Sequence, residues 1–121
     1  MLQYIKKNYS LAWIVTLILI ILIFYISSIP DSSIPRIDFK YNSQLYHFGI
    51  FAVLTFFSMI AFSKGGENKE FFYVATIFSG FYALTDELHQ FFVFGRSTSV
   101  EDFLIDCLGI FTGFLLNKSL K

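Results

Sequence analysis

The chain has 121 residues, of which 55% are hydrophobic and 21% aromatic, whereas only 15% are charged. Its 17 Phe and 7 Tyr residues exceed what a core of this length can bury in water, so the composition indicates a membrane protein rather than a soluble domain. Nine basic and nine acidic residues cancel, which argues against a nucleic acid partner.

Four segments are candidates for membrane-spanning helices, because crossing roughly 30 Å of hydrocarbon takes about 20 apolar residues. The first is uncharged and stops at Pro30; its apolar run exceeds the about 7 to 15 residues of a signal peptide, so we expect it to stay in the protein. The second ends at Lys64, and the third is long enough to span. The sequence therefore predicts an all-α, polytopic membrane protein in which residues 1–121 form one four-helix domain. The predicted helices are about 10–29, 43–63, 70–94 and 99–118.

The fourth segment requires charged residues inside the membrane. Its uncharged part, 107–117, makes only about 16 Å of helix and cannot span alone, so the helix must begin near Ser99. Ser99 with Asp102 also fits a helix N-cap box. Asp106 then lies roughly 10 Å inside its helix, and Asp86 lies roughly 12 Å inside the third helix. Both carboxylates are therefore expected at membrane depth.

The lysines and arginines between the predicted spans indicate the orientation, since cytoplasmic loops carry an excess of them. One side holds only Arg36, Lys40 and Arg96. The other side holds Lys6, Lys7, Lys64, Lys69, Lys118 and Lys121. We therefore expect both termini to lie in the cytoplasm.

This topology brings a group of polar residues to one level near the outer surface. They are His47, Asp86, Glu87, His89, Gln90, Arg96, Asp102 and Asp106. Those on the third helix form an arc of about 160°, with Glu87 at its edge, where it is better placed than Asp106 to face a ligand cavity. On the fourth helix, two carboxylates and two glycines fall within about 60°: Asp102, Asp106, Gly109 and Gly113. Because glycines permit close helix approach, this stripe is expected to face the bundle interior.

Charged residues at this depth are expected to have a charge partner or a functional role, because placing a charge at mid-bilayer costs at least about 2.5 kcal/mol of insertion free energy. Four interpretations stay open. The residues form a polar network that orients the helices; they bind a metal through Asp86-x-x-His89; they relay protons; or they run acid–base chemistry on a lipid headgroup, with Glu87, His89 and Asp86 as candidate catalytic residues. Whether the protein is an enzyme stays open. We expect no metal or other cofactor, because no complete ligand spacing is present and Arg96 would repel a cation.

Residues 85–109 read TDELHQFFVFGRSTSVEDFLIDCLG and closely resemble the signature of the VanZ-like family, approximately T-D-E-x-H-Q-x-F-x-x-G-R-x-x-S-x-x-D-x-x-x-D-x-x-G. Upstream, Ser27-Ser28-Ile29-Pro30 and His47-Phe48 are also similar to the family, so the resemblance covers nearly the whole chain. It implies a four-helix bacterial membrane protein, and the founding member of the family is associated with resistance to the lipoglycopeptide teicoplanin.

The chain departs from the family at one point. The family often has Asp-Lys where Ser43 and Gln44 stand. If that lysine pairs with a buried carboxylate in other members, Arg96 or Lys40 must replace it here, or the carboxylate is protonated.

These observations favour a non-transporting protein of the bacterial inner membrane that binds or modifies an amphiphilic envelope molecule. Arg96 would bind an anionic headgroup by bidentate hydrogen bonds, and Glu87 or His89 would transfer protons. The other expected ligand-binding residues are His47, Gln90, Asp102 and Asp106. The expected partners are membrane lipids and a lipid-linked envelope molecule, whereas the oligomeric state is not determined. The rival interpretation is a structural or partner-binding protein whose polar network only orients the helices.

Overall fold

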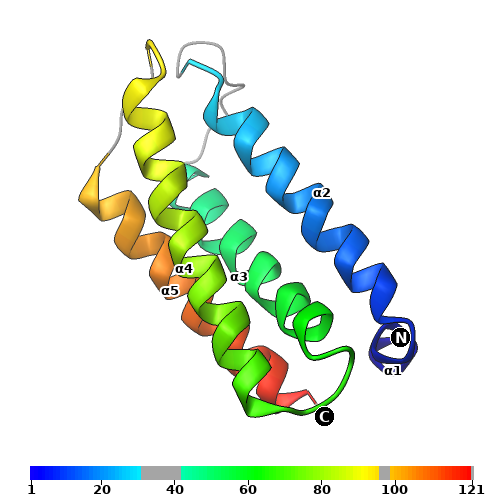
Figure 1. Ribbon diagram of the computed structural model, residues 1–121. Helices are drawn as coiled ribbons and strands as arrows, with labels where there is room; N and C mark the ends of the chain where they lie inside the picture. The colour runs from blue at the N-terminus through cyan, green and yellow to red at the C-terminus, as the bar shows by residue number, and fades with distance from the viewer. Residues whose placement is uncertain (31–41, 96–98, 121) are drawn as a thin grey trace.

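The computed structural model describes residues 1–30, 42–95 and 99–120, and within these ranges it contains helices and turns but no strand. The helices are α1 (Leu2–Lys7), α2 (Tyr9–Ser27), α3 (Asn42–Phe62), α4 (Lys69–Phe92) and α5 (Val100–Ser119). The four long helices form a bundle, and both chain ends lie at the same end of it (Figure 1). The all-α prediction is confirmed, and the predicted helix ends differ from the observed ones by the one or two residues usual for helix termini.

Helix α2 buries one narrow stripe and exposes apolar side chains on its other sides. The buried positions recur every three or four residues: Ala12, Thr16, Leu19, Ile23 and Ser27. Large apolar side chains between them are exposed, including Ile18 at 57%, Ile21 at 68% and Phe24 at 57%. A helix that is apolar on its exposed faces is suited to lipid rather than to water.

Helix α3 lies at the centre, in contact with α2, α4 and α5. Its closest approach is to α5, where two glycines one turn apart meet its backbone. A Cβ atom at Gly109 would lie 2.3 Å from the carbonyl oxygen of Phe48, and one at Gly113 would lie 2.3 Å from that of Ala52. Only glycine fits such a contact. The predicted glycine stripe therefore faces the bundle interior.

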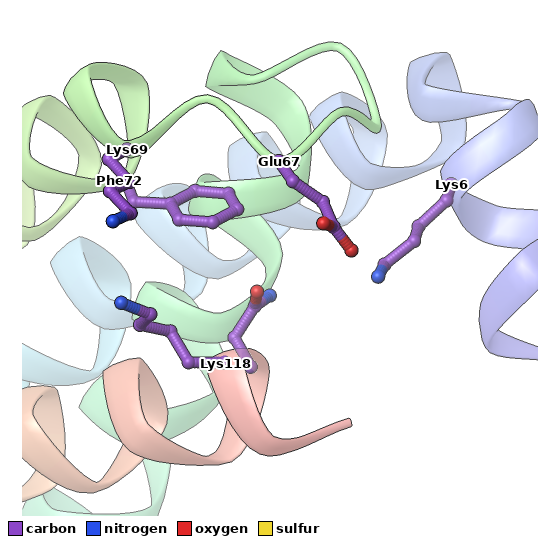
Figure 2. A pocket seen from close by; sticks show the side chains of 6 residues that line it. Lys6, Glu67, Lys69, Phe72 and Lys118 are labelled. Carbon is purple, nitrogen blue, oxygen red and sulfur yellow. The ribbon is translucent and has the colours of Figure 1, made fainter. Parts of the chain in front are cut away.

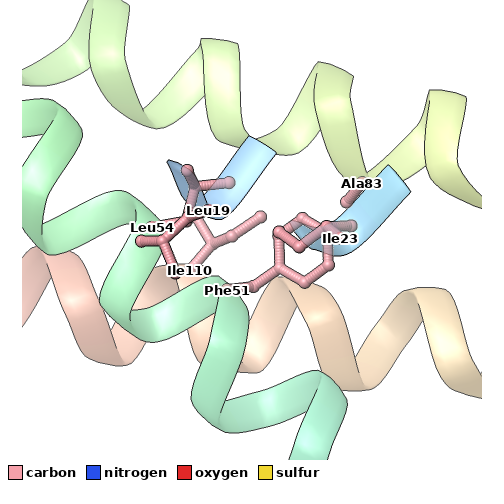
Figure 3. Close-up of a cluster of buried hydrophobic side chains, with 6 residues drawn as sticks. All are labelled: Leu19, Ile23, Phe51, Leu54, Ala83 and Ile110. Atoms are coloured by element: carbon pink, nitrogen blue, oxygen red, sulfur yellow. The ribbon is translucent and has the colours of Figure 1, made fainter. Parts of the chain in front are cut away.

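All four long helices contribute to the largest apolar core (Figure 3). Its residues are Leu19 and Ile23 of α2, Phe51 and Leu54 of α3, Ala83 of α4 and Ile110 of α5. Polar contacts add to this packing: the Tyr82 hydroxyl donates to the Ile20 carbonyl at 2.6 Å, and the Asn117 amide donates to the Phe56 carbonyl at 2.9 Å. These bonds connect α4 to α2 and α5 to α3.

Helix α1 is absent from the predicted elements, because its six residues contain no apolar run. It forms through tertiary packing instead, with Leu2 and Ile5 against the buried cluster that includes Ile60. The turn after α3 also contacts it. Gly65 has a φ of +78°, and a Cβ there would lie 1.9 Å from the Lys6 carbonyl oxygen, so glycine is required for both reasons.

Within the described residues, two helices are long and apolar enough to cross a membrane by length and composition, over Tyr9–Ser27 and Ser43–Phe62. Helices α4 and α5 have 24 and 20 residues, which is sufficient length, but each carries several charged side chains. The prediction of four spans therefore stays a prediction.

Candidate functional site

Four buried ionisable residues from three helices meet near the end of the bundle that lies away from the chain termini. One side-chain nitrogen or oxygen atom of each residue lies within 4.8 Å of those of the other three. The polar cluster consists of His47 on α3, Asp86 and Glu87 on α4, and Asp106 on α5. These side chains are 2%, 5%, 8% and 0% exposed. Three carboxylates and one imidazole thus share a small volume inside the bundle.

The close packing of α5 on α3 places Asp106 beside His47. Gly109 contacts the backbone at Phe48, and Asp106 lies one turn before Gly109 on the same face of α5. His47 directly precedes Phe48 on α3, and its Nδ1 lies 2.8 Å from Oδ1 of Asp106. The second carboxylate oxygen of Asp106, Oδ2, is buried and has no hydrogen-bond partner among the described residues.

The end of α2 closes the polar cluster on the other side. The Ser27 hydroxyl donates to Oδ1 of Asp86, and the Gln90 side-chain amide donates to the Ser27 oxygen at 3.2 Å. Ser27 and Gln90 are each 1% exposed. Asp86 is therefore held in place by the Ser27 hydroxyl of α2. This hydroxyl is itself oriented by Gln90, a residue of the same helix as Asp86.

Glu87 has a second environment besides the polar cluster. It lines an apolar groove of ≈ 340 Å³ between α4 and the beginning of α5. The other residues of the groove are Leu84, Leu88, Phe91, Ser99, Val100 and Phe103. Leu88, Phe91 and Val100 are exposed at 55%, 67% and 75%, so the groove opens onto the outer surface of the bundle. Glu87 lies where this groove meets the polar interior.

The structure does not bring all the predicted residues into the polar cluster. His89 turns toward α2 instead, where its Nε2 lies 2.8 Å from the Ser28 hydroxyl and its ring stacks on Phe24 at 4.5 Å. Asp102 is half-buried one turn before Asp106, and its backbone N–H donates to the Ser99 hydroxyl at 3.1 Å, which is the predicted N-cap contact. Arg96 lies outside the described residues.

Ser27 and Ser28 contact residues of the site, but the sequence did not predict this. Both belong to the segment Ser27-Ser28-Ile29-Pro30, which resembles the family and lies at the end of the first predicted helix. The resemblance marks these serines as part of the family pattern. A serine at the end of an apolar run does not, however, indicate which side chain its hydroxyl will bind.

The fold and the site together define a helical membrane protein with a buried histidine–carboxylate cluster. The family model described as VanZ/LLP1 matches residues 9–121, so the chain belongs to this family, as the sequence signature predicted. No curated protein and no solved structure matches the chain significantly.

Proposed function

We propose that this VanZ-like membrane protein spans the bacterial inner membrane four times, with both termini in the cytoplasm, and binds or modifies an amphiphilic cell-envelope molecule at its outer end. The observation that carries the proposal is the position of Glu87, which belongs to the polar cluster and also lines the apolar groove. An amphiphile requires these two environments side by side, one for its tail and one for its headgroup.

Four spans are supported by where α4 and α5 place their charges. The membrane-depth carboxylates of both helices, Asp86, Glu87 and Asp106, are turned inward and buried. The exposed side chains at intervening positions are apolar: Ile77, Phe81, Leu84 and Leu88 on α4, and Leu104, Leu108, Phe111 and Leu115 on α5. The inward charges lower the mean hydropathy of both helices, but lipid would contact only their apolar surface.

The orientation is supported by the lysines at the opposite end of the bundle. Lys6, Lys69 and Lys118 surround one pocket there, together with Glu67 (Figure 2). An excess of lysine marks the cytoplasmic side. Reporter fusions after Asp38 and after Lys121 test this assignment, with an outer and a cytoplasmic location expected. A C-terminus found outside the cell would contradict the proposal and move the polar cluster to the cytoplasmic side.

The groove fits the tail of an amphiphile and leaves its headgroup near Glu87. Its ≈ 340 Å³ falls in the range of small-molecule sites, about 300 to 1,000 Å³. Helix α5 begins at the groove with Ser99 and Val100, and the N-terminal end of a helix favours an anionic group. Hydroxyl or amine groups of the headgroup would donate to the Glu87 carboxylate, and the proposal assigns its anionic group to Arg96.

Photoreactive lysophosphatidylglycerol tests the proposal, because its headgroup carries a phosphate and hydroxyls on a single acyl chain. We expect labelling of wild-type protein in nanodiscs at Leu88, Phe91 or Phe103. In the Glu87→Gln variant labelling should fall about fivefold or more, with the melting temperature nearly unchanged, since the amide keeps the shape of the carboxylate. Glu70→Gln on the same helix, an exposed position at the other end, is the matched control.

A rival function has its own support. The contacts of Ser27 with Asp86 and of His47 with Asp106 suit a network that only orients the helices. Under this rival, Glu87→Gln would lose labelling only in proportion to folded protein. Teicoplanin added as a competitor tests the envelope ligand that the family resemblance suggests, and unchanged labelling would exclude it from the groove.

A further inference from the structure

The polar cluster contains the side chains from which proteins build metal sites without thiolates. We propose that it binds one divalent first-row transition-metal ion, such as Zn²⁺ or Mn²⁺, through His47, Asp86, Glu87 and Asp106. The metal site shares Glu87 with the groove but does not rest on the proposed function, since an ion can occupy the polar cluster whether or not an amphiphile enters.

The expectation of no metal rested on spacing along the chain and on Arg96. The spacing considered, Asp86-x-x-His89, does not form a pair of ligands, because His89 contacts Ser28 on α2. The structure instead draws its candidate ligands from α3, α4 and α5, and a set divided among three helices has no recognisable spacing. Occupation of the polar cluster by the Arg96 guanidinium in place of a metal is the alternative that the measurement decides.

The geometry is close to that of an occupied site. Metal–ligand bonds to imidazole nitrogen and carboxylate oxygen are about 2.0 to 2.2 Å long, so ligand atoms around one ion lie about 3 to 4 Å apart. The four candidate atoms lie within 4.8 Å of one another. Movements of about half an ångström or slightly more in each side chain would close this shell, and four ligands complete a tetrahedral site.

Asp106 provides the independent observation that a ligand belongs in the polar cluster. Its side chain is 0% exposed, yet Oδ2 has no hydrogen-bond partner among the described residues. Leaving a buried acceptor unpaired costs about 1 to 3 kcal/mol, and more when the group is charged. A metal ion bound to Oδ2 and to Nδ1 of His47 would remove this cost, and the ion would replace the hydrogen bond that joins Nδ1 to Oδ1 at 2.8 Å.

The surroundings also resemble the outer shell of a metal site. Ligating carboxylates are usually fixed by hydrogen bonds from residues behind them. Asp86 accepts such a bond from the Ser27 hydroxyl, and Gln90 donates to the same hydroxyl oxygen at 3.2 Å. Asp86 is therefore supported by two residues, Ser27 and Gln90, that are not themselves candidate ligands.

The donor set indicates which ions fit. Mg²⁺ and Ca²⁺ prefer shells made entirely of oxygen, so the imidazole of His47 favours a first-row transition metal. Cys107 follows Asp106 but is not part of the polar cluster, so no thiolate selects Cu⁺ or a sulfur-rich zinc site. An ion here would lie beside Glu87, where it could also bind an anionic oxygen at the inner end of the groove.

The test measures metal directly on protein in dodecyl maltoside. Protein stripped with a chelator is dialysed against a micromolar excess of Zn²⁺ or Mn²⁺ and then against metal-free buffer, and bound metal is counted by elemental analysis. Loss of the free Mn²⁺ signal in electron paramagnetic resonance provides a second readout. The variants are His47→Gln and Glu87→Gln, and His89→Ala is the matched control, because it removes a histidine outside the polar cluster.

We expect about one equivalent of metal in the wild type and in His89→Ala, and at least tenfold lower occupancy in His47→Gln and Glu87→Gln. Circular dichroism and gel filtration restrict the comparison to folded variants, and Glu87→Gln keeps the test decisive if His47→Gln does not fold. Less than about 0.1 equivalent in the wild type would overturn the proposal, and so would equal losses in His89→Ala and His47→Gln.

The metal measurement and the lipid labelling fail separately. Metal binding without labelling of the groove supports the metal site and contradicts the proposed function. Labelling of metal-free protein at the wild-type level, combined with no bound metal, leaves the amphiphile site standing and removes the metal. Neither experiment uses the result of the other.

Discussion

The two ends of the bundle both gather charged residues, but they treat them in opposite ways. At the end where the chain termini lie, Lys69 and Glu67 are exposed, and Lys6 and Lys118 are half-buried around a pocket of ≈ 250 Å³ (Figure 2). At the other end, the four residues of the polar cluster are almost fully buried between three helices.

The difference shows that the energetic cost of a charged residue near a helix end depends on whether its charge stays hydrated. A lysine at the very end of a helix keeps its ammonium group in water or among lipid headgroups at little cost. A carboxylate two turns further in loses this hydration and must be compensated by the protein or by something the protein binds. Residues at the end that holds the polar cluster should therefore contribute more to the free energy of unfolding than residues at the end where the chain termini lie, and four substitutions measure the difference.

The largest effect is expected where the backbone of α5 meets that of α3. Gly109→Ala would place a Cβ 2.3 Å from the Phe48 carbonyl oxygen, and no rotamer change can relieve a contact with backbone. Overpacking usually lowers the free energy of unfolding by about 1 to 3 kcal/mol, and we expect a larger loss here, with at least tenfold less folded protein. Gly80→Ala is the control, since nothing lies within 4 Å of its added methyl group. Yields and melting curves in detergent give the comparison, and equal behaviour of the two variants would contradict it.

The second effect concerns the buried pair itself. Asp106→Ala leaves His47 without its carboxylate at 2.8 Å, and removing one member of a buried pair typically costs about 3 to 5 kcal/mol. Asp102→Ala, one turn earlier on α5, changes a half-buried residue and should cost less than about 1 kcal/mol. Thermal unfolding of both variants tests the difference. Similar losses would show that depth in the bundle does not decide the cost.

The third effect separates two adjacent serines at the end of α2. Ser27→Ala removes the hydroxyl that donates to Asp86, and a hydrogen bond to a charged group is worth about 1.5 to 3 kcal/mol. Ser28→Ala removes contacts with the Phe24 carbonyl and His89 in an exposed position, so it should cost under about 1 kcal/mol. A larger loss in Ser28→Ala than in Ser27→Ala would place the important α2–α4 contact outside the polar cluster.

The sequence was sufficient to locate the long helices and the face of α5 that packs inside the bundle. Apolar runs and the proline, glycine and charged residues at their ends place the helix ends to within one or two residues. The glycine stripe was also predictable, since a three-residue gap between glycines marks a close approach in any apolar helix. The short helix α1 was not, because it depends on packing of Leu2 and Ile5 rather than on a pattern of its own.

The membership of the polar cluster could be predicted only in part. A helical wheel places Asp86, Glu87 and His89 on one arc, but it does not show how the neighbouring helices are rotated against that arc. In the structure, α2 contacts His89 through Ser28 and Asp86 through Ser27, whereas His47 of α3 and Asp106 of α5 lie near Glu87. The helix faces follow from the sequence, whereas the partner of each face is a property of the packed bundle.

The smallest effect is expected at the end of the bundle where the chain termini lie. Lys118 lies with its Nζ 5.5 Å from the centre of the Phe114 ring, and a cation–π contact of a partly exposed lysine contributes about 0.5 to 1 kcal/mol. Lys118→Ala should therefore lower stability by no more than about 1 kcal/mol, well below Asp106→Ala on the same helix. Under the proposed topology its effect should instead appear in the orientation of the protein, because it removes one of the positive charges expected to keep the C-terminus in the cytoplasm. Combining Lys118→Ala with Lys69→Ala and repeating the C-terminal reporter fusion measures this, with a detectable outward fraction expected and thermal stability of the remaining protein nearly unchanged. A large loss of stability without any change in orientation would mean that the lysines at this end, like the carboxylates of the polar cluster, hold the helices together.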